Sequence, residues 1–394
     1  MIKNLITMTI PTEFDDIRPY TPDELPAIYE ELIADEAFKN VIEKVMPGIP
    51  FEVFAQQMRQ CKTNLEFQKT FCYPFLGKLA EKYSNGMTID CESIKGNGHP
   101  RTFITNHRDI VLDSAFLSVL LVDNGFNTVE IAIGDNLLIY PWIKKLVRIN
   151  KSFIVQRALT MRQMLEASAC MSRYMHFAIN QKKENLWIAQ REGRAKDSDD
   201  RTQDSVLKMM AMGGEGAIIE RLMELHIVPA AISYEFDPCD YLKAKEFQQK
   251  RDNPDFKKSR EDDLLNMQTG LFGYKGRIHF QLAACIDNEL RTIDPKTPKT
   301  ELFSLISTLI DKQIHRNYRL YQGNYVAYDS LKNEQRFTEK YTTEEKKTFE
   351  TYLQGQLDKI DLPNKDEEFL REKLLIMYAN PVINQLKAIE TINR

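Results

Sequence analysis

The spacing of hydrophobic and polar residues changes twice along the chain, and these changes mark three regions. Residues 1–85 and residues 301–394 carry apolar side chains at intervals of three and four, which is the spacing of amphipathic helices. The helical stripes run through Phe54, Met58, Phe67, Phe71 and Leu79 in the first region and through Phe349, Tyr352, Leu353, Leu357 and Ile360 in the last. Residues 86–300 have shorter apolar runs of alternating type. We therefore predict a helical N-terminal region, a central α/β domain and a helical C-terminal region.

Short β-prone runs alternate with helical runs in the central region. The strand candidates are Arg101–Asn106, Val129–Gly134, Ser152–Arg157, Leu186–Arg191, Ile227–Tyr234 and Arg277–Ala283, and the helical runs are 110–122, 161–181 and 203–225. This alternation predicts an α/β fold with a mostly parallel central sheet flanked by helices. Residues 240–266 interrupt it as a charged insertion, in which Lys243–Asp263 holds thirteen charges in twenty-one residues. We expect the charged run to be a solvated surface segment.

Composition excludes several classes of protein. With 43% hydrophobic and 28% charged residues, the chain has the ordinary make-up of a soluble globular protein. No window approaches the roughly 18 consecutive apolar residues of a membrane span, and the first eight residues lack the core of a signal peptide. We therefore expect a cytoplasmic protein, either soluble or peripheral on the inner face of the membrane. The six cysteines form no CxxC pair, so the sequence indicates neither a zinc site nor a disulfide framework.

Charge is distributed unevenly along the chain. The net charge of −4 argues against nucleic acid as a general partner. From Lys144 to Arg201, however, thirteen Lys or Arg face six Asp or Glu, a local balance of +7. A basic segment within an acidic protein points to an anionic ligand.

The first strand candidate ends in a histidine where a strand gives way to a helix. This is a usual place for chemistry in α/β folds, because the strand end is rigid and the helix N-terminus offers unpaired amides. Asp113 could hold one ring nitrogen of His107 and leave the other as a base toward a hydroxyl. On one continuous helix the two residues would lie about 240° apart, so this contact requires His107 to lie in a turn before the helix. Asp109 competes for the role, although it also suits the N-cap of a helix that begins at Ile110.

Cationic side chains follow two further strand candidates. Ser152–Arg157 ends in Arg157, and Leu186–Arg191 leads into a turn with Glu192, Gly193 and Arg194. In a parallel sheet these strand ends lie at the edge that also carries His107, and the guanidinium group binds phosphate with two hydrogen bonds. The Ile227–Tyr234 strand contains Pro229, which suits the beginning of a strand or an irregular edge.

In this order the residues resemble the four sequence blocks of the glycerophospholipid acyltransferase family, whose enzymes acylate glycerol 3-phosphate or lysophosphatidate. The matching residues are Asn106 and His107 with Asp113, the strand from Phe153 to Arg157, the turn Glu192, Gly193 and Arg194, and the apolar strand with Pro229. Two departures stand out. Five residues separate the histidine from the aspartate where the family usually has four, and Ala189, Gln190 and Arg191 replace the Phe-Pro that precedes the third block in many members.

The resemblance implies an O-acyltransferase in phospholipid biosynthesis, with acyl-CoA or acyl carrier protein as donor and a lysophospholipid or glycerol phosphate as acceptor. It requires no metal and no bound cofactor. The implied roles are His107 and Asp113 as general base and its orienting carboxylate, Arg157, Glu192, Gly193 and Arg194 at the acceptor phosphate, and Asn106, Arg108 and Pro229 at the acyl donor or in the pocket. Glu192 is expected to shape the turn or brace an arginine, because a carboxylate facing a phosphate would repel it. A lyso-aminolipid acceptor, or a non-catalytic protein that binds lipid or phosphoanions, remains an alternative.

One segment has the composition of a membrane interface. Residues 137–143 are apolar and aromatic, and Lys144 and Lys145 follow them. A helix packed on the edge of the sheet explains the pattern equally well. The lipid substrates of the family favour contact with a membrane surface.

Overall fold

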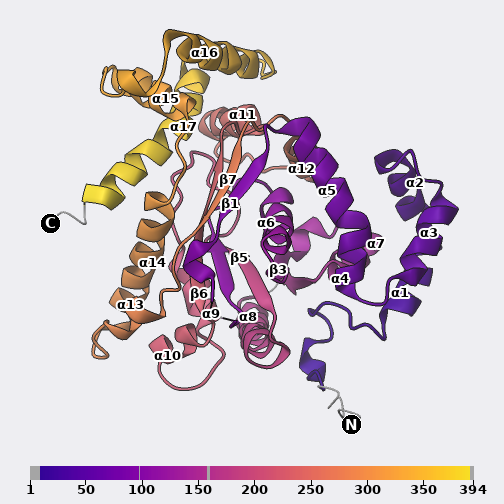
Figure 1. The fold of residues 1–394 in the computed structure, drawn as a ribbon. Coiled ribbons are helices and arrows are strands. Elements are labelled where there is room, and N and C mark those ends of the chain that lie inside the picture. Colours follow the sequence, from indigo (N-terminus) through magenta and orange to yellow (C-terminus); the bar gives the residue numbers. More distant parts are fainter. Residues whose placement is uncertain (1–8, 97, 158–159, 391–394) are drawn as a thin grey trace.

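Seven strands form one sheet at the centre of the molecule (Figure 1). A computed structural model of the chain describes residues 9–96, 98–157 and 160–390. The strands are β1 (Met87–Asp90), β2 (Thr102–Thr105), β3 (Val129–Gly134), β4 (Ser152–Val155), β5 (Asn185–Ala189), β6 (Ile227–Tyr234) and β7 (Ile278–Leu282). Their order across the sheet is β1-β7-β6-β2-β5-β3-β4. From β6 to β4 all neighbours are parallel, whereas β7 runs antiparallel to β6 and parallel to β1.

The predicted α/β class and all six predicted strands are confirmed. The strand β1 was missed, because four residues beside Gly86 give too short an alternation to distinguish an edge strand from a loop. The helical run expected over 203–225 forms two helices, α9 (Asp204–Met210) and α10 (Ile218–Met223). Between them Gly214 and Gly216 have φ values of 77° and 80°, a backbone conformation that no α-helix contains.

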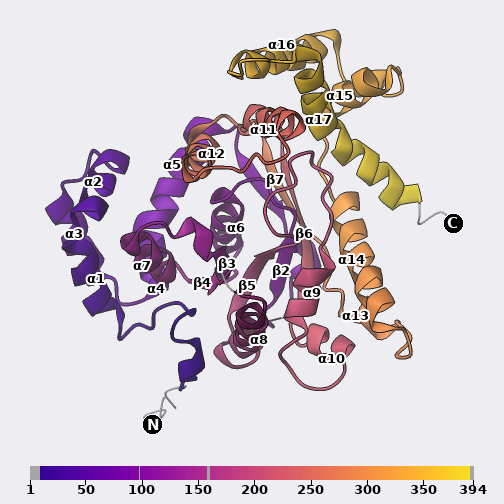
Figure 2. The same cartoon turned by 180° about the vertical axis from the view of Figure 1, so that it is seen from behind.

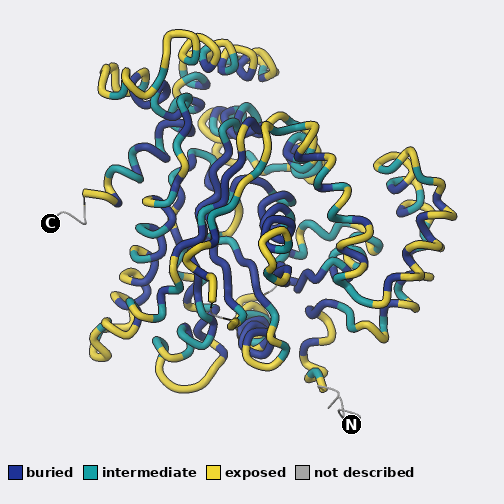
Figure 3. The backbone as a smooth tube through the Cα atoms, in the orientation of Figure 1, coloured by how far each residue is buried: buried dark blue, intermediate teal, exposed yellow. Residues whose placement is uncertain are grey.

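Helices cover both faces of the sheet, and the strands between them are buried (Figure 3). The helices α5 (Tyr73–Tyr83) and α6 (Leu112–Asp123) pack on the face that carries Phe103 and Trp187. The helices α8 (Met161–Phe177), α9, α10, α13 (Asp287–Arg291) and α14 (Lys299–Arg316) pack on the face of Ile104 and Ile188. Because successive side chains of a strand point to opposite faces, the adjacent Phe103 and Ile104 enter separate cores.

Helical regions lie on opposite sides of the sheet, as Figures 1 and 2 show from two directions. The N-terminal helices are α1 (Leu25–Ile33), α2 (Glu36–Val45), α3 (Phe51–Gln60) and α4 (Asn64–Phe67), and a π-helical turn over Gln68–Cys72 joins α4 to α5. The C-terminal helices are α15 (Gln322–Lys332), α16 (Thr343–Asp358) and α17 (Glu367–Glu390). Each region has an apolar core of its own. Within the described part of the chain, no helix has the length and apolar character needed to cross a membrane.

The segment with interfacial composition forms helix α7 (Pro141–Ile149), whose apolar side faces the N-terminal helices. Trp142 packs against Phe38 with 5.8 Å between ring centroids, and Lys145 forms an ion pair with Glu31 at 2.7 Å. Most of this segment is therefore a packed helix, as one of the two interpretations expected. It packs against the N-terminal helices and not against the edge of the sheet. Tyr140 stays half exposed.

The charged insertion is solvated in part: most of its charged side chains from Lys250 to Glu261 are exposed, as the sequence predicted, but two charges before them are buried. It forms α11 (Asp240–Asp252) and α12 (Arg260–Phe272), and Lys243 and Glu246 are buried. Lys243 pairs with Asp237, and Glu246 pairs with Lys196. Buried charges require such partners, and these two partners lie outside the charged run, so the composition of the run alone could not reveal its burial.

Candidate active site

The carboxyl ends of the parallel strands bring the predicted site residues to one edge of the sheet. His107 lies two residues beyond β2, Arg157 two residues beyond β4, and Glu192 three residues beyond β5. Since β2, β5, β3 and β4 are successive neighbours in the sheet, these turns lie along the same edge.

Asp113 is the carboxylate that contacts the imidazole. Its Oδ2 lies 2.8 Å from Nδ1 of His107 and also accepts the backbone N–H groups of Arg108 at 2.7 Å and Asp109 at 3.1 Å. The hydroxyl of Tyr234 donates to Oδ1 at 3.2 Å. Four donors thus fix a buried carboxylate at the second position of α6. His107 lies in the segment between the end of β2 and the start of α6, before the helix, as the contact requires.

This contact selects the tautomer of the neutral imidazole. A carboxylate accepts hydrogen bonds, so Nδ1 of His107 is the donor, and in the neutral ring Nε2 then carries the lone pair. Nε2 makes no hydrogen bond to any other described residue, and the side chain of His107 keeps 13% of its surface exposed. The ring packs edge-on against Trp187 at 5.8 Å between centroids. The arrangement is that of an oriented base with one nitrogen facing outward.

Asp109 supports the turn that leads into α6, a helix that begins at Leu112 and not at Ile110 as the sequence suggested. Its Oδ1 accepts the backbone N–H groups of Val111 and Leu112, both at 2.8 Å. Its Oδ2 lies against the backbone of Gly270 in α12, where a Cβ atom would approach to 2.1 Å. Burial raises the pKa of the Asp109 carboxyl, and the charge of Asp113 raises it further. Asp109 therefore shapes the turn and does not touch the imidazole.

Arg157 and Glu192 bring the β4 and β5 turns together. Their side chains form an ion pair at 3.2 Å, and both are substantially exposed. The guanidinium group of Arg157 lies over Gly134, where a Cβ atom would come within 2.9 Å of Nε. Gly193 has φ of 68°, which allows the sharp turn after Glu192 without strain.

Arg194 lies deeper than the sequence suggested. Its Nη2 donates to Oδ1 of Asn266 in α12 at 2.8 Å, and its buried Nη1 has no hydrogen-bond partner within the described part of the chain. Burial lowers the pKa of Arg194, but the nearby Cys239, Asp237 and Asp109 outweigh it and raise the pKa overall. Arg194 thus links the turn after β5 to α12. The neighbouring Arg191 also has a buried Nε without a partner among the described residues.

The three residues expected at the acyl donor or in its pocket belong to the frame of the site. Asn106 is fully buried, accepts the N–H of Ile232 at 2.8 Å and donates to its carbonyl at 3.0 Å, so it fastens β2 to β6. Arg108 is buried and pairs with Asp200 at 2.7 Å. Pro229 is the third residue of β6, where it pairs with Ile104 of β2, and its carbonyl accepts the N–H of Ala283 just after β7 at 2.9 Å. The sequence could not reveal these roles, because they depend on which residues the sheet places opposite them.

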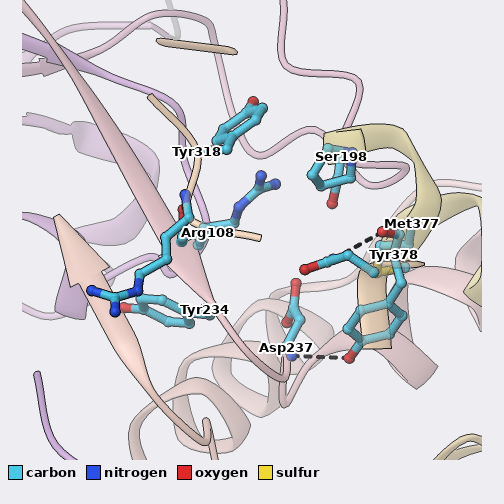
Figure 4. A pocket seen from close by; sticks show the side chains of 11 residues that line it. Arg108, Ser198, Tyr234, Asp237, Tyr318, Met377 and Tyr378 are labelled. Atoms are coloured by element: carbon cyan, nitrogen blue, oxygen red, sulfur yellow. Dashed lines mark hydrogen bonds between the residues drawn. The ribbon is translucent and has the colours of Figure 1, made fainter. Parts of the chain in front are cut away.

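A depression lies beside this frame, with an empty volume of about 410 Å³ that includes open solvent. It is lined by Arg108, Ser198, Ser233, Tyr234, Asp237, Tyr318, Arg319, Asn324, Met377, Tyr378 and Pro381. In Figure 4 the side chains of Arg108, Tyr234 and Tyr318 face those of Ser198, Met377 and Tyr378 across it, with Asp237 below. His107 is not among the lining residues, so the depression is separate from the outward face of the imidazole.

Sequence analysis missed Asp200, Tyr234 and Tyr318. Asp200 is fully buried and accepts hydrogen bonds from Arg108 and, at 2.5 Å, from the hydroxyl of Tyr318. The basic segment also looks different in the fold, because many of its cations are neutralised. The pairs are Lys151 with Glu184, Lys182 with Glu130, Arg173 with Glu13, Lys196 with Glu246 and Arg201 with Asp199. Except for Asp199, which lies two residues before Arg201, these partners are distant in sequence, and no local motif signals them.

Solved structures, and not sequence comparisons, show a likeness of this chain to known proteins. No protein-family model matches the sequence, and no curated protein matches it. Among solved structures, the chain is similar in fold to the 1-acyl-sn-glycerophosphate (LPA) acyltransferase PlsC from Thermotoga maritima, with 9% sequence identity and a TM-score of 0.35. The match covers 74% of this chain and 97% of the PlsC chain.

Proposed function

We propose that this chain is an O-acyltransferase that moves a fatty acyl group from a thioester of coenzyme A or acyl carrier protein to a hydroxyl of a glycerol-phosphate acceptor. The observation that carries the proposal is the His107–Asp113 contact of 2.8 Å, in which Nδ1 is held and Nε2 faces outward. A base in this state can deprotonate a hydroxyl at neutral pH. Arg157 provides a cation at the same edge of the sheet.

The proposed reaction proceeds by direct transfer. Nε2 of His107 removes the proton of the acceptor hydroxyl while the oxygen attacks the carbonyl carbon of the thioester. The tetrahedral intermediate collapses, the C–S bond breaks, and the departing thiolate takes the proton from the imidazolium. Asp113 stabilises the imidazolium while it exists. A base positioned in this way contributes about 10²–10⁴-fold to the rate. The proposed steps use only side chains and the thioester, without a metal or bound cofactor.

The acceptor phosphate is proposed to bind to Arg157 in place of Glu192. Their ion pair is exposed, and exposed pairs contribute only about 0–1 kcal/mol, so a doubly charged phosphate can displace the carboxylate. Arg194 supports the site indirectly, because its hydrogen bond to Asn266 holds the turn after β5 in place. Glu192 would then close over Arg157 only when the site is empty. This division of roles predicts that Arg157 affects the KM for the acceptor more than kcat.

Contact with a membrane surface is part of the proposal. Tyr140 and the first turn of α8, with Met161, Met164 and Leu165, expose large apolar side chains near the β4 end that carries Arg157. Exposed apolar side chains beside a lipid-binding site favour peripheral binding at the interface. Co-sedimentation with anionic vesicles tests it, because replacing Met161 and Leu165 by Ser should reduce the bound fraction. Unchanged sedimentation would contradict the membrane contact alone.

Initial rates with three acceptors test the function. The acceptors are glycerol 3-phosphate, lysophosphatidate and an N-acylated amino acid that carries a hydroxyl, each with acyl-CoA and with acyl carrier protein as donor. We expect turnover with a phosphate acceptor, loss of turnover in His107→Ala and a raised acceptor KM in Arg157→Gln. Arg162→Gln, which removes an exposed cation on α8, is the matched control. Retained turnover in His107→Ala would refute the mechanism, and preference for the phosphate-free acceptor would refute the role of Arg157.

A further inference from the structure

A histidine, a cysteine and an aspartate meet at the end of the sheet opposite to His107. His226 immediately precedes β6, and Cys285 and Asp287 follow β7. One ligand atom from each residue lies within 4.8 Å of the other two, and all three residues are partly exposed. Because β6 runs parallel to β2, its start lies at the amino ends of the parallel strands, away from the ends that carry His107. The eight residues of β6 separate the two edges by roughly 20–25 Å, so this cluster is not part of the candidate active site.

The backbone holds the three residues in place. The N–H of Ile286 donates to the carbonyl of Ile227 at 3.0 Å, so the segment that carries Cys285 and Asp287 is bonded to the start of β6. The carbonyl of His226 accepts the N–H of Thr102 at 3.3 Å. Three chain segments thus converge on a fixed platform, and a ligand set formed in this way exists before any ion binds.

The side chains also leave coordinating capacity unused. Nδ1 of His226 lies 2.8 Å from Oδ2 of Asp287, but the buried Oδ1 of Asp287 has no hydrogen-bond partner among the described residues. An unpartnered carboxylate oxygen away from water is costly unless something binds it. A further imidazole, that of His99, lies with its ring centroid 5.8 Å from that of His226.

We propose that His226, Cys285 and Asp287 bind a divalent metal ion of the zinc class. Imidazole nitrogen, thiolate sulfur and carboxylate oxygen are the three ligand types that Zn²⁺ accepts, at about 2.0–2.3 Å, whereas Mg²⁺ and Ca²⁺ prefer oxygen alone. The thiolate and the carboxylate carry two negative charges, which match the charge of the ion. Water or His99 supplies the fourth ligand of a tetrahedral site. Binding moves one proton from the Cys285 thiol to solvent, because the ligand is the thiolate.

The sequence did not indicate this site, because its ligands come from two distant segments and not from a CxxC pair. The proposed ion would tie the beginning of β6 to the end of β7, which is the antiparallel pair that joins β1 to the rest of the sheet. Its expected effect is on stability, since an ion that binds only the folded chain raises the unfolding temperature by mass action. It plays no part in the proposed acyl transfer.

Co²⁺ titration of the tag-free, reduced and chelator-treated full chain tests the proposal. We expect one Co²⁺ per chain, a sulfur-to-cobalt charge-transfer band, displacement of that band by Zn²⁺, and a higher unfolding temperature with Zn²⁺. Cys285→Ser should abolish the band. Cys170→Ser, which changes another partly buried free thiol, should keep it.

A second pair of variants covers the case in which Cys285→Ser does not fold. Asp287→Asn and His226→Gln keep the thiol. Loss of a residue that only supports a ligand weakens metal binding by about 10–100-fold, so each of these variants, which loses a ligand, should weaken Co²⁺ binding by more. Absence of a stoichiometric ion in the unmodified chain, a band that survives Cys285→Ser, or unchanged affinity in both Asp287→Asn and His226→Gln would each overturn the proposal. Acyltransferase activity is not the readout, so failure of this site leaves the proposed function untouched.

Discussion

Replacing Asp113 by Asn separates the electrostatic role of this carboxylate from its structural role. The amide oxygen of Asn can take the position of Oδ2 and keep the hydrogen bonds from His107, Arg108 and Asp109. The amide NH₂ then faces the hydroxyl of Tyr234, which can accept instead of donate. The cost to the free energy of unfolding should therefore be about 0.5–1.5 kcal/mol, the worth of one ordinary hydrogen bond.

The cost to catalysis should be much larger. At the 2.8 Å that separates Nδ1 from Oδ2, a unit charge pair is worth on the order of 6 kcal/mol at an effective dielectric constant of about 20. Asn removes this attraction when the imidazolium forms, and the neutral hydrogen bond that remains returns part of it. We expect kcat to fall by about 10²–10⁴-fold, which is about 3–5 kcal/mol of the barrier.

Thiol release from acyl-CoA in the presence of a saturating acceptor measures this effect, and chemical denaturation measures the fold. Asp109→Asn is the matched control, since Asp109 lies four residues away, is also buried and accepts hydrogen bonds only from backbone N–H groups. It should change kcat by less than about tenfold. Equal losses in Asp113→Asn and Asp109→Asn would refute the assignment, because a general disturbance of the turn would then explain both.

Three further changes test the frame of the site. Burial, with a smaller effect of Asp237, raises the pKa of Asp240 to about 7, so the ionised form of Asp240 destabilises the fold. The free energy of unfolding should therefore fall by a few kcal/mol as the pH rises from about 4 to about 7. Urea denaturation should show a flatter pH profile in Asp240→Asn than in the unmodified chain. In Gly193→Ala the added Cβ atom meets no neighbouring atom, but the residue must keep φ near 68°. The free energy of unfolding measured by thermal denaturation should therefore fall by about 1–2 kcal/mol. An unchanged value would mean that the turn relaxes. Asp200→Asn should lower the free energy of unfolding by about 3–5 kcal/mol, because it leaves Arg108 charged and unpaired. The double variant with Arg108→Met should recover most of that loss. If it does not, the buried ion pair is not the cause.

The sequence was informative where local pattern decides structure. Short β-branched runs bounded by turn residues predicted six strands, because alternation and propensity act within four to eight residues. The position of His107 between a strand and a helix followed from the same reasoning. The competition between Asp109 and Asp113 could not be resolved in this way, since both spacings are compatible with a turn. The path of the backbone at 108–111 decides it.

The sequence was less informative where partners come from distant segments. Lys243 and Glu246 looked like solvated charges, because Asp237 and Lys196 become their partners only after the chain folds. The burial of Arg194 likewise depends on α12, which packs over the β5 turn and supplies Asn266. Pairing of buried charges is a property of three-dimensional neighbours, so composition and spacing cannot report it.

The three residues after β2 explain why the site needs both layers of the fold. Asn106 fastens β2 to β6, His107 turns toward α6 and its carboxylate, and Arg108 turns toward Asp200 on the side of α14. Because these contacts come from adjacent residues, a backbone shift that moved the imidazole away from Asp113 would also strain the buried pair of Arg108 with Asp200. Tyr318, just beyond α14, completes that pair through Asp200. The C-terminal region therefore contacts the turn that carries the candidate base through Asp200, and its support of the base is indirect.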